Sequence, residues 1–135
     1  MSDCIFCKLI KGEIPSSKVY EDKDVLAFLD IGPVNKGHTL VIPKKHYETI
    51  WDVPDKVLGV MMVKSKEISK AIEKAVKADG INIMMSNRKP AGQLVPHAHI
   101  HIIPRYKQDG YKHWPQGKYE EGEMKSYAEI IKKNL

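Results

Sequence analysis

The chain has 135 residues, a formal net charge of +5 and 42% hydrophobic residues, which suits one domain with its own core. Residues 1–10 lack the apolar run of a secretion signal, and the longest apolar patch, residues 57–63, is too short to cross a membrane. Two cysteines do not make a disulfide framework. These features predict a soluble, cytoplasmic protein with no membrane partner, and the positive charge favours anionic ligands.

The first half of the chain contains a short amphipathic segment followed by segments rich in β-branched residues. Asp3 is expected to cap a helix that Gly12 ends. A turn over residues 22–24 is expected to join two strands as a hairpin. The elements predicted here are a helix over residues 4–11 and strands over residues 18–21, 25–29 and 39–42.

The second half opens with Asp52 and Pro54, which suit the first turn of a long helix that Asp79 and Gly80 end. Its apolar stripe has helical spacing and is expected to face the core or another subunit. The stripe comprises Leu58, Met61, Met62, Ile68, Ile72, Ala75 and Val76. Further on we predict a strand over residues 81–85, the strand around residues 97–103, an irregular arm over 106–122, and a terminal helix over 124–135 with Tyr127, Ile130 and Ile131 inward.

The resulting fold class is α+β: an antiparallel sheet of about five strands, one long helix, and short N- and C-terminal helices. No internal repeat or low-complexity segment interrupts this pattern.

Three histidines, His97, His99 and His101, alternate with apolar residues. Alternation is typical of a strand, so the histidines should share one face while the apolar residues meet the core on the other. Crowded imidazoles lower one another's pKa, which should keep at least one ring neutral near pH 7. A neutral imidazole can act as a nucleophile, a base or a metal ligand. The alternative is a polar strand face that happens to carry histidine.

Residues 97–103 match the His-x-His-x-His-x-x motif, with apolar x, and thereby resemble the histidine triad (HIT) family. Other blocks of the chain resemble the same family, in its order and at its spacing. These blocks are residues 26–31, residues 37–46, residues 91–93, and Pro104 with Arg105. The resemblance spans roughly residues 3–107, which is most of the chain.

The resemblance implies a HIT-like fold, with residues 1–107 as a nucleotide-binding catalytic domain and residues 108–135 as a C-terminal arm and helix of the same domain. It also implies that two subunits form a symmetric homodimer. On the sequence alone, the long helix offers only a candidate apolar surface for such an interface.

The resemblance further implies a nucleotide hydrolase or nucleotidyl transferase that cleaves at the α-phosphate of dinucleoside polyphosphates or nucleoside phosphoramidates. His99 would be the nucleophile and form a covalent nucleotidyl-histidine. His101 would contact the phosphate or the leaving group, and His97 completes the catalytic triad. Leu94 stands where many members of the family carry Ser or Thr. A hydroxyl that could assist the leaving group is therefore missing, which narrows the expected leaving groups.

The residues expected to bind nucleotide also follow from the resemblance. Asp30 would accept hydrogen bonds from the ribose hydroxyls, and the turn at Gly92 and Gln93 would offer N–H groups to phosphate. The full set is Phe6, Leu9, Phe28, Asp30, Ile31, Asn87, Gly92 and Gln93. Two alternatives remain open: Asp30 as a turn residue, and the apolar members as plain core.

Cys4 and Cys7 are spaced i and i+3, so a helix would bring both thiols to one face. The resemblance to zinc-containing bacterial and archaeal members implies that His46 and His97 complete a structural zinc site with them. Two buried free thiols, or a redox pair, are the alternatives.

Two other functional classes compete with the enzyme. A nucleotide-binding sensor or interaction protein would keep the pocket with weak catalysis, and a metalloenzyme would use the three histidines as metal ligands. The intact His99 favours the enzyme over the sensor, and the block around Asp30 has no role in a metalloenzyme. A nucleotide is the expected substrate, and nucleic acid is not expected as a partner.

Overall fold

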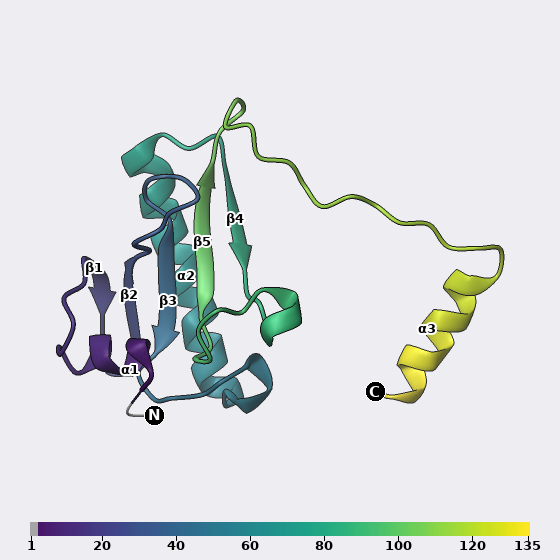
Figure 1. Cartoon of the computed structure of the whole chain (residues 1–135), viewed down its shortest axis with the longest axis horizontal. Coiled ribbons are helices and arrows are strands. Elements are labelled where there is room, and N and C mark those ends of the chain that lie inside the picture. Colours follow the sequence, from purple (N-terminus) through teal and green to yellow (C-terminus); the bar gives the residue numbers. More distant parts are fainter. Residues whose placement is uncertain (1–2) are drawn as a thin grey trace.

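A computed structural model of the chain describes residues 3–135. Five strands form one sheet in the order β1-β2-β3-β5-β4, and every neighbouring pair is antiparallel. The strands are β1 (Lys18–Glu21), β2 (Val25–Leu29), β3 (Thr39–Pro43), β4 (Gly80–Met84) and β5 (Ile100–Arg105). The helices are α1 (Ile5–Ile10), α2 (Asp55–Val76), α3 (Glu123–Lys133) and the short 3-10 turns η1 (Ile50–Asp52) and η2 (Lys89–Ala91). The predicted α+β class is confirmed (Figure 1).

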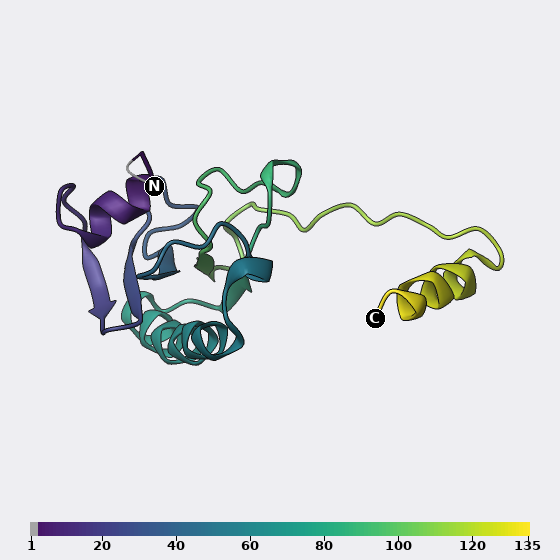
Figure 2. The same ribbon diagram turned by 90° about the horizontal axis from the view of Figure 1, so that it is seen from below.

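The two faces of the sheet carry different helices, α2 on one and α1 on the other (Figure 2). Ala98, Ile100 and Ile102 pack with the buried side of α2 in one core cluster. The smaller cluster gathers α1 residues and the opposite side chains of β2 and β3. The alternation of residues 97–102 therefore directs the apolar residues toward α2 and the histidines toward the face that carries α1.

Several predicted boundaries shift. β5 begins at Ile100, so only His101 lies within the strand, while His97 and His99 precede it. Cys4, not Asp3, is the N-cap of α1. The long helix α2 begins three residues later than its expected start at Asp52, after the separate turn η1. It ends at Val76, before the expected stop, because Lys77 adopts a left-handed conformation with φ 51°.

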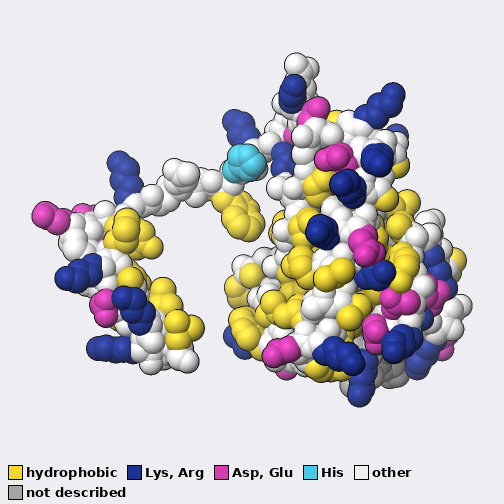
Figure 3. Space-filling model, turned by 180° about the vertical axis from the view of Figure 1, so that it is seen from behind, with side chains coloured by type: hydrophobic (Ala, Val, Ile, Leu, Met, Phe, Trp, Pro, Cys, Tyr) yellow, Lys and Arg dark blue, Asp and Glu magenta, His cyan; other side chains and the backbone are white. Residues whose placement is uncertain are grey.

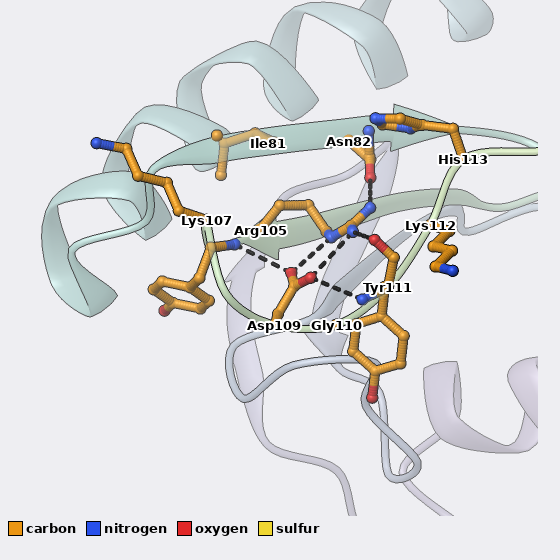
Figure 4. A pocket seen from close by; sticks show the side chains of 11 residues that line it. Ile81, Asn82, Arg105, Lys107, Asp109, Gly110, Tyr111, Lys112 and His113 are labelled. Carbon is orange, nitrogen blue, oxygen red and sulfur yellow. Dashed lines mark hydrogen bonds and ion pairs between the residues drawn. The ribbon is translucent and has the colours of Figure 1, made fainter.

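The chain leaves the sheet through a rigid turn at the end of β5 (Figure 4). Arg105 Nε and Nη2 donate to Asp109 at 2.8 and 3.1 Å, and Nη2 also donates to the Tyr111 carbonyl at 2.9 Å. Asp109 accepts further bonds from the backbone N–H groups of Tyr106 and Tyr111. The Arg105 guanidinium and these N–H groups hold the pKa of Asp109 far below its usual range. These bonds hold the first residues of the arm, as far as Tyr111, against the end of β5.

Beyond this turn the arm runs without regular structure and carries α3 away from the body (Figure 1). The expectation that Tyr127, Ile130 and Ile131 point inward is wrong for the single chain, because their side chains are 52%, 55% and 61% exposed. The arm places α3 where its own body offers no surface to cover it. Within residues 3–135 no helix combines the length and apolar character needed to cross a membrane.

Candidate active site

His99 is buried between the sheet and α1, with its ring edge-to-face against Phe6 at 5.2 Å between centroids. Its Nδ1 lies 2.7 Å from the carbonyl oxygen of His97. A carbonyl only accepts, so Nδ1 carries the proton and Nε2 keeps a free lone pair in the neutral ring. Burial lowers the pKa of His99, which favours that neutral ring at pH 7. The ring is thus held in the tautomer that a nucleophile requires.

His101 has its tautomer fixed by a chain of hydrogen bonds that begins at Val34. The Val34 N–H donates to His38 Nδ1 at 3.1 Å, so neutral His38 carries its proton on Nε2. That proton is donated to His101 Nδ1 at 2.9 Å, which leaves the proton of His101 on Nε2. Burial, aided by His99 and His38, lowers the pKa of His101 to about 4. His99 and His101 therefore hold opposite tautomers, one offering a lone pair and the other an N–H.

The sequence analysis missed His38. It lies within the matched block of residues 37–46, just before β3, and is 3% exposed. The pairing of β3 with β5 sets Leu40 opposite His101, which brings His38 alongside that ring. The signal that could have identified His38 is its position just before a strand that pairs with the triad strand. That signal can be used only when the strand order is known.

Asp30 lies at the same cluster and divides its two oxygens. Oδ1 accepts the Gly32 N–H at 2.8 Å, which is the turn role left open above. Oδ2 lies 3.6 Å from His38 Nε2. One oxygen therefore serves the turn while the other faces the histidines, and ribose binding by Asp30 stays a prediction.

The apolar residues expected to hold the base divide into two groups. Phe6, Leu9 and Phe28 are buried together in the α1-side cluster, with the two phenylalanine rings 5.4 Å apart. Ile31 is fully exposed instead, at 102%. The structure thus brings the first three together as core beside His99 and leaves Ile31 outside them.

Residues 86–93 form a tight loop in which the expected phosphate donors already have acceptors. The Gly92 N–H donates to Lys89 O at 2.9 Å, and the Gln93 N–H donates to Arg88 O at 3.2 Å. Asn87 Oδ1 accepts the Ile50 N–H at 2.8 Å. Position 92 requires glycine because its φ is 97°, a conformation that other residues rarely adopt. Crowding is not the reason, since an added Cβ would meet only ordinary contacts. Phosphate contacts by these residues stay a prediction and would require the N–H bonds to be shared.

Cys4, Cys7, His46 and His97 converge at the N-terminus of α1, with their four candidate ligand atoms within 4.8 Å of one another. His97 Nδ1 lies 3.5 Å from Cys4 Sγ and 3.7 Å from Cys7 Sγ, and His46 Nδ1 lies 3.3 Å from Cys7 Sγ. Tetrahedral zinc with ordinary bond lengths sets sulfur and nitrogen ligands about 3.5 Å apart. His97 Nε2 donates to Pro43 O at 2.9 Å, which frees Nδ1 for a metal. The four residues therefore fit a zinc ion.

Comparison with known proteins places this site in a family. The HIT domain model matches residues 11–108. An uncharacterized HIT-like protein of Methanocaldococcus jannaschii is 56% identical over 109 residues, which cover 79% of this chain and 82% of the relative. The crystal structure of a HIT family protein from Bacillus subtilis superimposes with a TM-score of 0.91 at 43% identity, covering 98% of this chain and 97% of that one. The chain belongs to the HIT domain family.

Some relatives carry names that state an activity or a ligand. An adenylylsulfatase of Arabidopsis thaliana is 47% identical over 108 residues, 80% of this chain and 55% of its own length. An adenosine 5′-monophosphoramidase of Saccharomyces cerevisiae is 48% identical over 102 residues, 76% of this chain and 62% of its own. A zinc-bound histidine triad protein of Mycobacterium smegmatis superimposes with a TM-score of 0.79 at 34% identity, covering 98% of this chain and 96% of that one. The family thus includes hydrolases that act on nucleotides.

Proposed function

We propose that this protein is a nucleotide hydrolase or nucleotidyl transferase that cleaves at the α-phosphate of dinucleoside polyphosphates or nucleoside phosphoramidates through a covalent nucleotidyl-histidine on His99. The observation that carries the proposal is the 2.7 Å bond from His99 Nδ1 to His97 O, which leaves Nε2 unprotonated for attack. The activities named for the plant and yeast relatives support the same bond class.

The proposed reaction has two displacements. His99 Nε2 attacks the α-phosphorus, a nitrogen–phosphorus bond forms, and the bond to the leaving group breaks with its electron pair on the leaving atom. Water then attacks the same phosphorus, the nitrogen–phosphorus bond breaks, and the histidine and the nucleoside monophosphate are released; another acceptor would instead leave carrying the nucleotidyl group. One difficult step is split into two easier ones.

His101 would assist these steps with its Nε2–H, which can donate to a phosphoryl oxygen or to the departing atom. The hydrogen bond from His38 Nε2–H to His101 Nδ1 keeps the proton of His101 on Nε2. Asp30 would accept from the ribose hydroxyls with its second oxygen, and Phe6 would flank the base. His97 contributes its carbonyl to His99.

A substrate panel with purified protein tests the function. Dinucleoside tetraphosphate, adenosine phosphoramidate and adenylyl sulfate should each yield the nucleoside monophosphate, and a dinucleoside monophosphate with only a phosphodiester should not. The nucleotide sensor is the competing reading, and it predicts nucleotide binding with no monophosphate formed from any of the three. That result would refute the enzyme.

Leu94 should set the preference among leaving groups. Its side chain is 88% exposed, so a serine there is tolerated by the fold. An apolar side chain cannot donate a proton, so basic amine leaving groups should react poorly relative to acidic polyphosphates. Leu94→Ser should raise kcat/KM for phosphoramidates relative to polyphosphates by about 10-fold, or about 1.4 kcal/mol. An equal change for both substrates would show that residue 94 acts elsewhere, and Leu94→Ala controls for the lost bulk.

Two unpartnered surfaces support a homodimer. The edge strand β4 has no neighbour on its outer side. The side of α3 that faces the body gathers hydrophobic side chains that stay exposed in the single chain (Figure 3). The match to the Bacillus subtilis structure covers nearly the whole chain, extended arm included. A second copy that lies under α3 would explain an extended arm in both chains.

Placing charge on the exposed face of α3 should therefore dissociate the dimer. Ile130→Asp combined with Ile131→Asp should raise the dimer dissociation constant at least about 100-fold, because burial of each isoleucine is worth about 1.5–3 kcal/mol. Sedimentation velocity would measure the masses. Lys125→Asp, a charge change of the same kind on the same helix, should leave the dimer intact. A wild-type protein that sediments as a monomer at all concentrations would refute the homodimer.

A further inference from the structure

Trp51 and Arg88 form an exposed pair beside the loop that precedes the histidines. The Trp51 side chain is 66% exposed, and Arg88 Cζ lies 4.6 Å from the centroid of its ring. Trp51 lies outside both core clusters among the described residues. A ring that stays largely in water adds little burial energy on folding, so core packing does not account for a tryptophan here.

The backbone of Arg88 is also unfavourable. Its φ of 75° and ψ of 160° lie in a region that is open almost only to glycine. Three hydrogen bonds hold it there: its N–H donates to Gln93 Oε1 at 2.6 Å, and its carbonyl accepts from the N–H groups of Ala91 and Gln93. The chain thus keeps an arginine at a position where glycine would be less strained. A glycine there would lack only the guanidinium-bearing side chain.

Trp51 is held as firmly on its side of the pair. The neighbouring Ile50 N–H donates to Asn87 Oδ1 at 2.8 Å, which ties η1 to the loop that carries Arg88. Asp52 accepts from the N–H and hydroxyl of Thr49 at 3.0 and 2.9 Å, which closes the η1 turn. Gln93 then connects this loop to Glu48 O at 2.6 Å. The backbone segments that carry the ring and the guanidinium are therefore tied together before any ligand arrives.

A planar aromatic ring beside a fixed guanidinium suits one class of ligand, a flat base that carries phosphate. Every base can stack on tryptophan or on a guanidinium plane, and the guanidinium also attracts phosphate oxygens. Lys89, exposed and next in the chain, adds a second positive charge. The loop that bears Arg88 leads within ten residues to His97, so one short segment of the chain connects the pair to the triad.

We propose that Trp51 and Arg88 bind the leaving-group half of a dinucleoside polyphosphate, with the second base stacked on the pair and Arg88 on the distal phosphates. This rests on the proposed function. The attacked half of the substrate is held by other residues, around His99 and Asp30. The pair therefore acts on substrates whose leaving group is itself a nucleotide.

Steady-state kinetics with two substrates tests the site. Trp51→Ala and Arg88→Gly should each raise KM for dinucleoside tetraphosphate by about 10-fold, the size of one lost base stack. Both should leave kcat and KM for adenosine phosphoramidate, which has no second base, within about twofold of wild type. Lys70→Ala, a remote exposed charge on α2, should change neither. Equal losses on both substrates would overturn the proposal.

Stability provides an independent readout. Arg88→Gly should raise Tm by about 3 °C, because glycine relieves the backbone strain. If Arg88 is a strained binding residue, Arg88→Gly should raise Tm and weaken substrate binding. If Arg88 is a structural residue, the same substitution should lower Tm. A lowered Tm would therefore overturn the proposal, as would a Trp51→Ala defect that follows loss of the dimer in sedimentation.

Binding without turnover separates this site from the proposed chemistry. The chain has two tryptophans, so Trp114→Phe leaves Trp51 as the remaining one. In this variant, dinucleoside tetraphosphate should quench the fluorescence of Trp51, and adenosine phosphoramidate should not. Quenching by both, or by neither, contradicts the subsite. Quenching by the dinucleotide in a protein that turns over no substrate would refute the proposed enzyme and leave the binding site standing.

Discussion

His99→Ala should abolish turnover while nucleotide binding survives. The variant loses the proposed nucleophile, and kcat should fall at least about 10⁴-fold, as for other covalent nucleophiles. The residues expected to hold ribose and phosphate keep their own bonds, because Asp30 and Gln93 are fixed by the backbone and not by His99. Kinetics on a phosphoramidate and calorimetric titration with nucleoside monophosphate would measure the two effects.

The matched control is His113→Ala, which removes an exposed imidazole from the arm and should change neither quantity. Rapid quenching of wild type with α-phosphate-labelled substrate should leave acid-labile label on the protein, and His99→Ala should carry none. A variant that turns over at the wild-type rate, or that still acquires the label, would exclude His99 as the nucleophile.

Loss of the proposed zinc should lower the free energy of unfolding by about 3 kcal/mol or more, or about 10 °C in Tm, since a ligand that binds only the folded state stabilises it by mass action. Cys4→Ser should produce this loss, because the four residues tie α1 to the segments that carry His46 and His97. Turnover at a temperature where the variant is folded should fall less, since Cys4 bonds neither His99 nor His101.

A chelator distinguishes the metal from the missing sulfur. Chelator should lower the Tm of wild type to that of Cys4→Ser and leave the Tm of the variant unchanged. Elemental analysis of wild type prepared without chelator should give one zinc per chain. If wild type prepared without chelator contains no metal and has the same Tm as chelator-treated wild type, the proposed zinc site is wrong.

The alternation of residues 97–102 predicted that the histidines share one face and the apolar residues meet the core on the other, because the period of two is a local property of extended backbone. The structure adds that the apolar face packs with α2. The hydrogen bond between His38 and His101 was not predictable in the same way. It depends on β3 lying next to β5, and nothing near His38 in the sequence specifies that neighbour. Local patterns identify faces, whereas cross-strand partners require the topology.

The terminal helix shows a second limit of the sequence. Its apolar spacing correctly predicted a helix with an apolar side, but it could not say whose surface that side covers. The loop before the triad shows a third limit. Gly92 and Gln93 are predicted to donate to phosphate, but the sequence did not indicate that their N–H groups and the glutamine side chain also hold the loop itself.

His97 performs its two tasks with different parts of one residue. Its ring faces the cysteines and His46, while its main-chain carbonyl orients His99. Every amino acid has that carbonyl, so exchange of the ring would remove a proposed metal ligand without deleting the acceptor for His99 Nδ1. Metal binding and nucleophile orientation can therefore diverge in evolution. A lineage could discard the cysteines, pack the base of α1 with apolar side chains, and keep the same chemistry at His99.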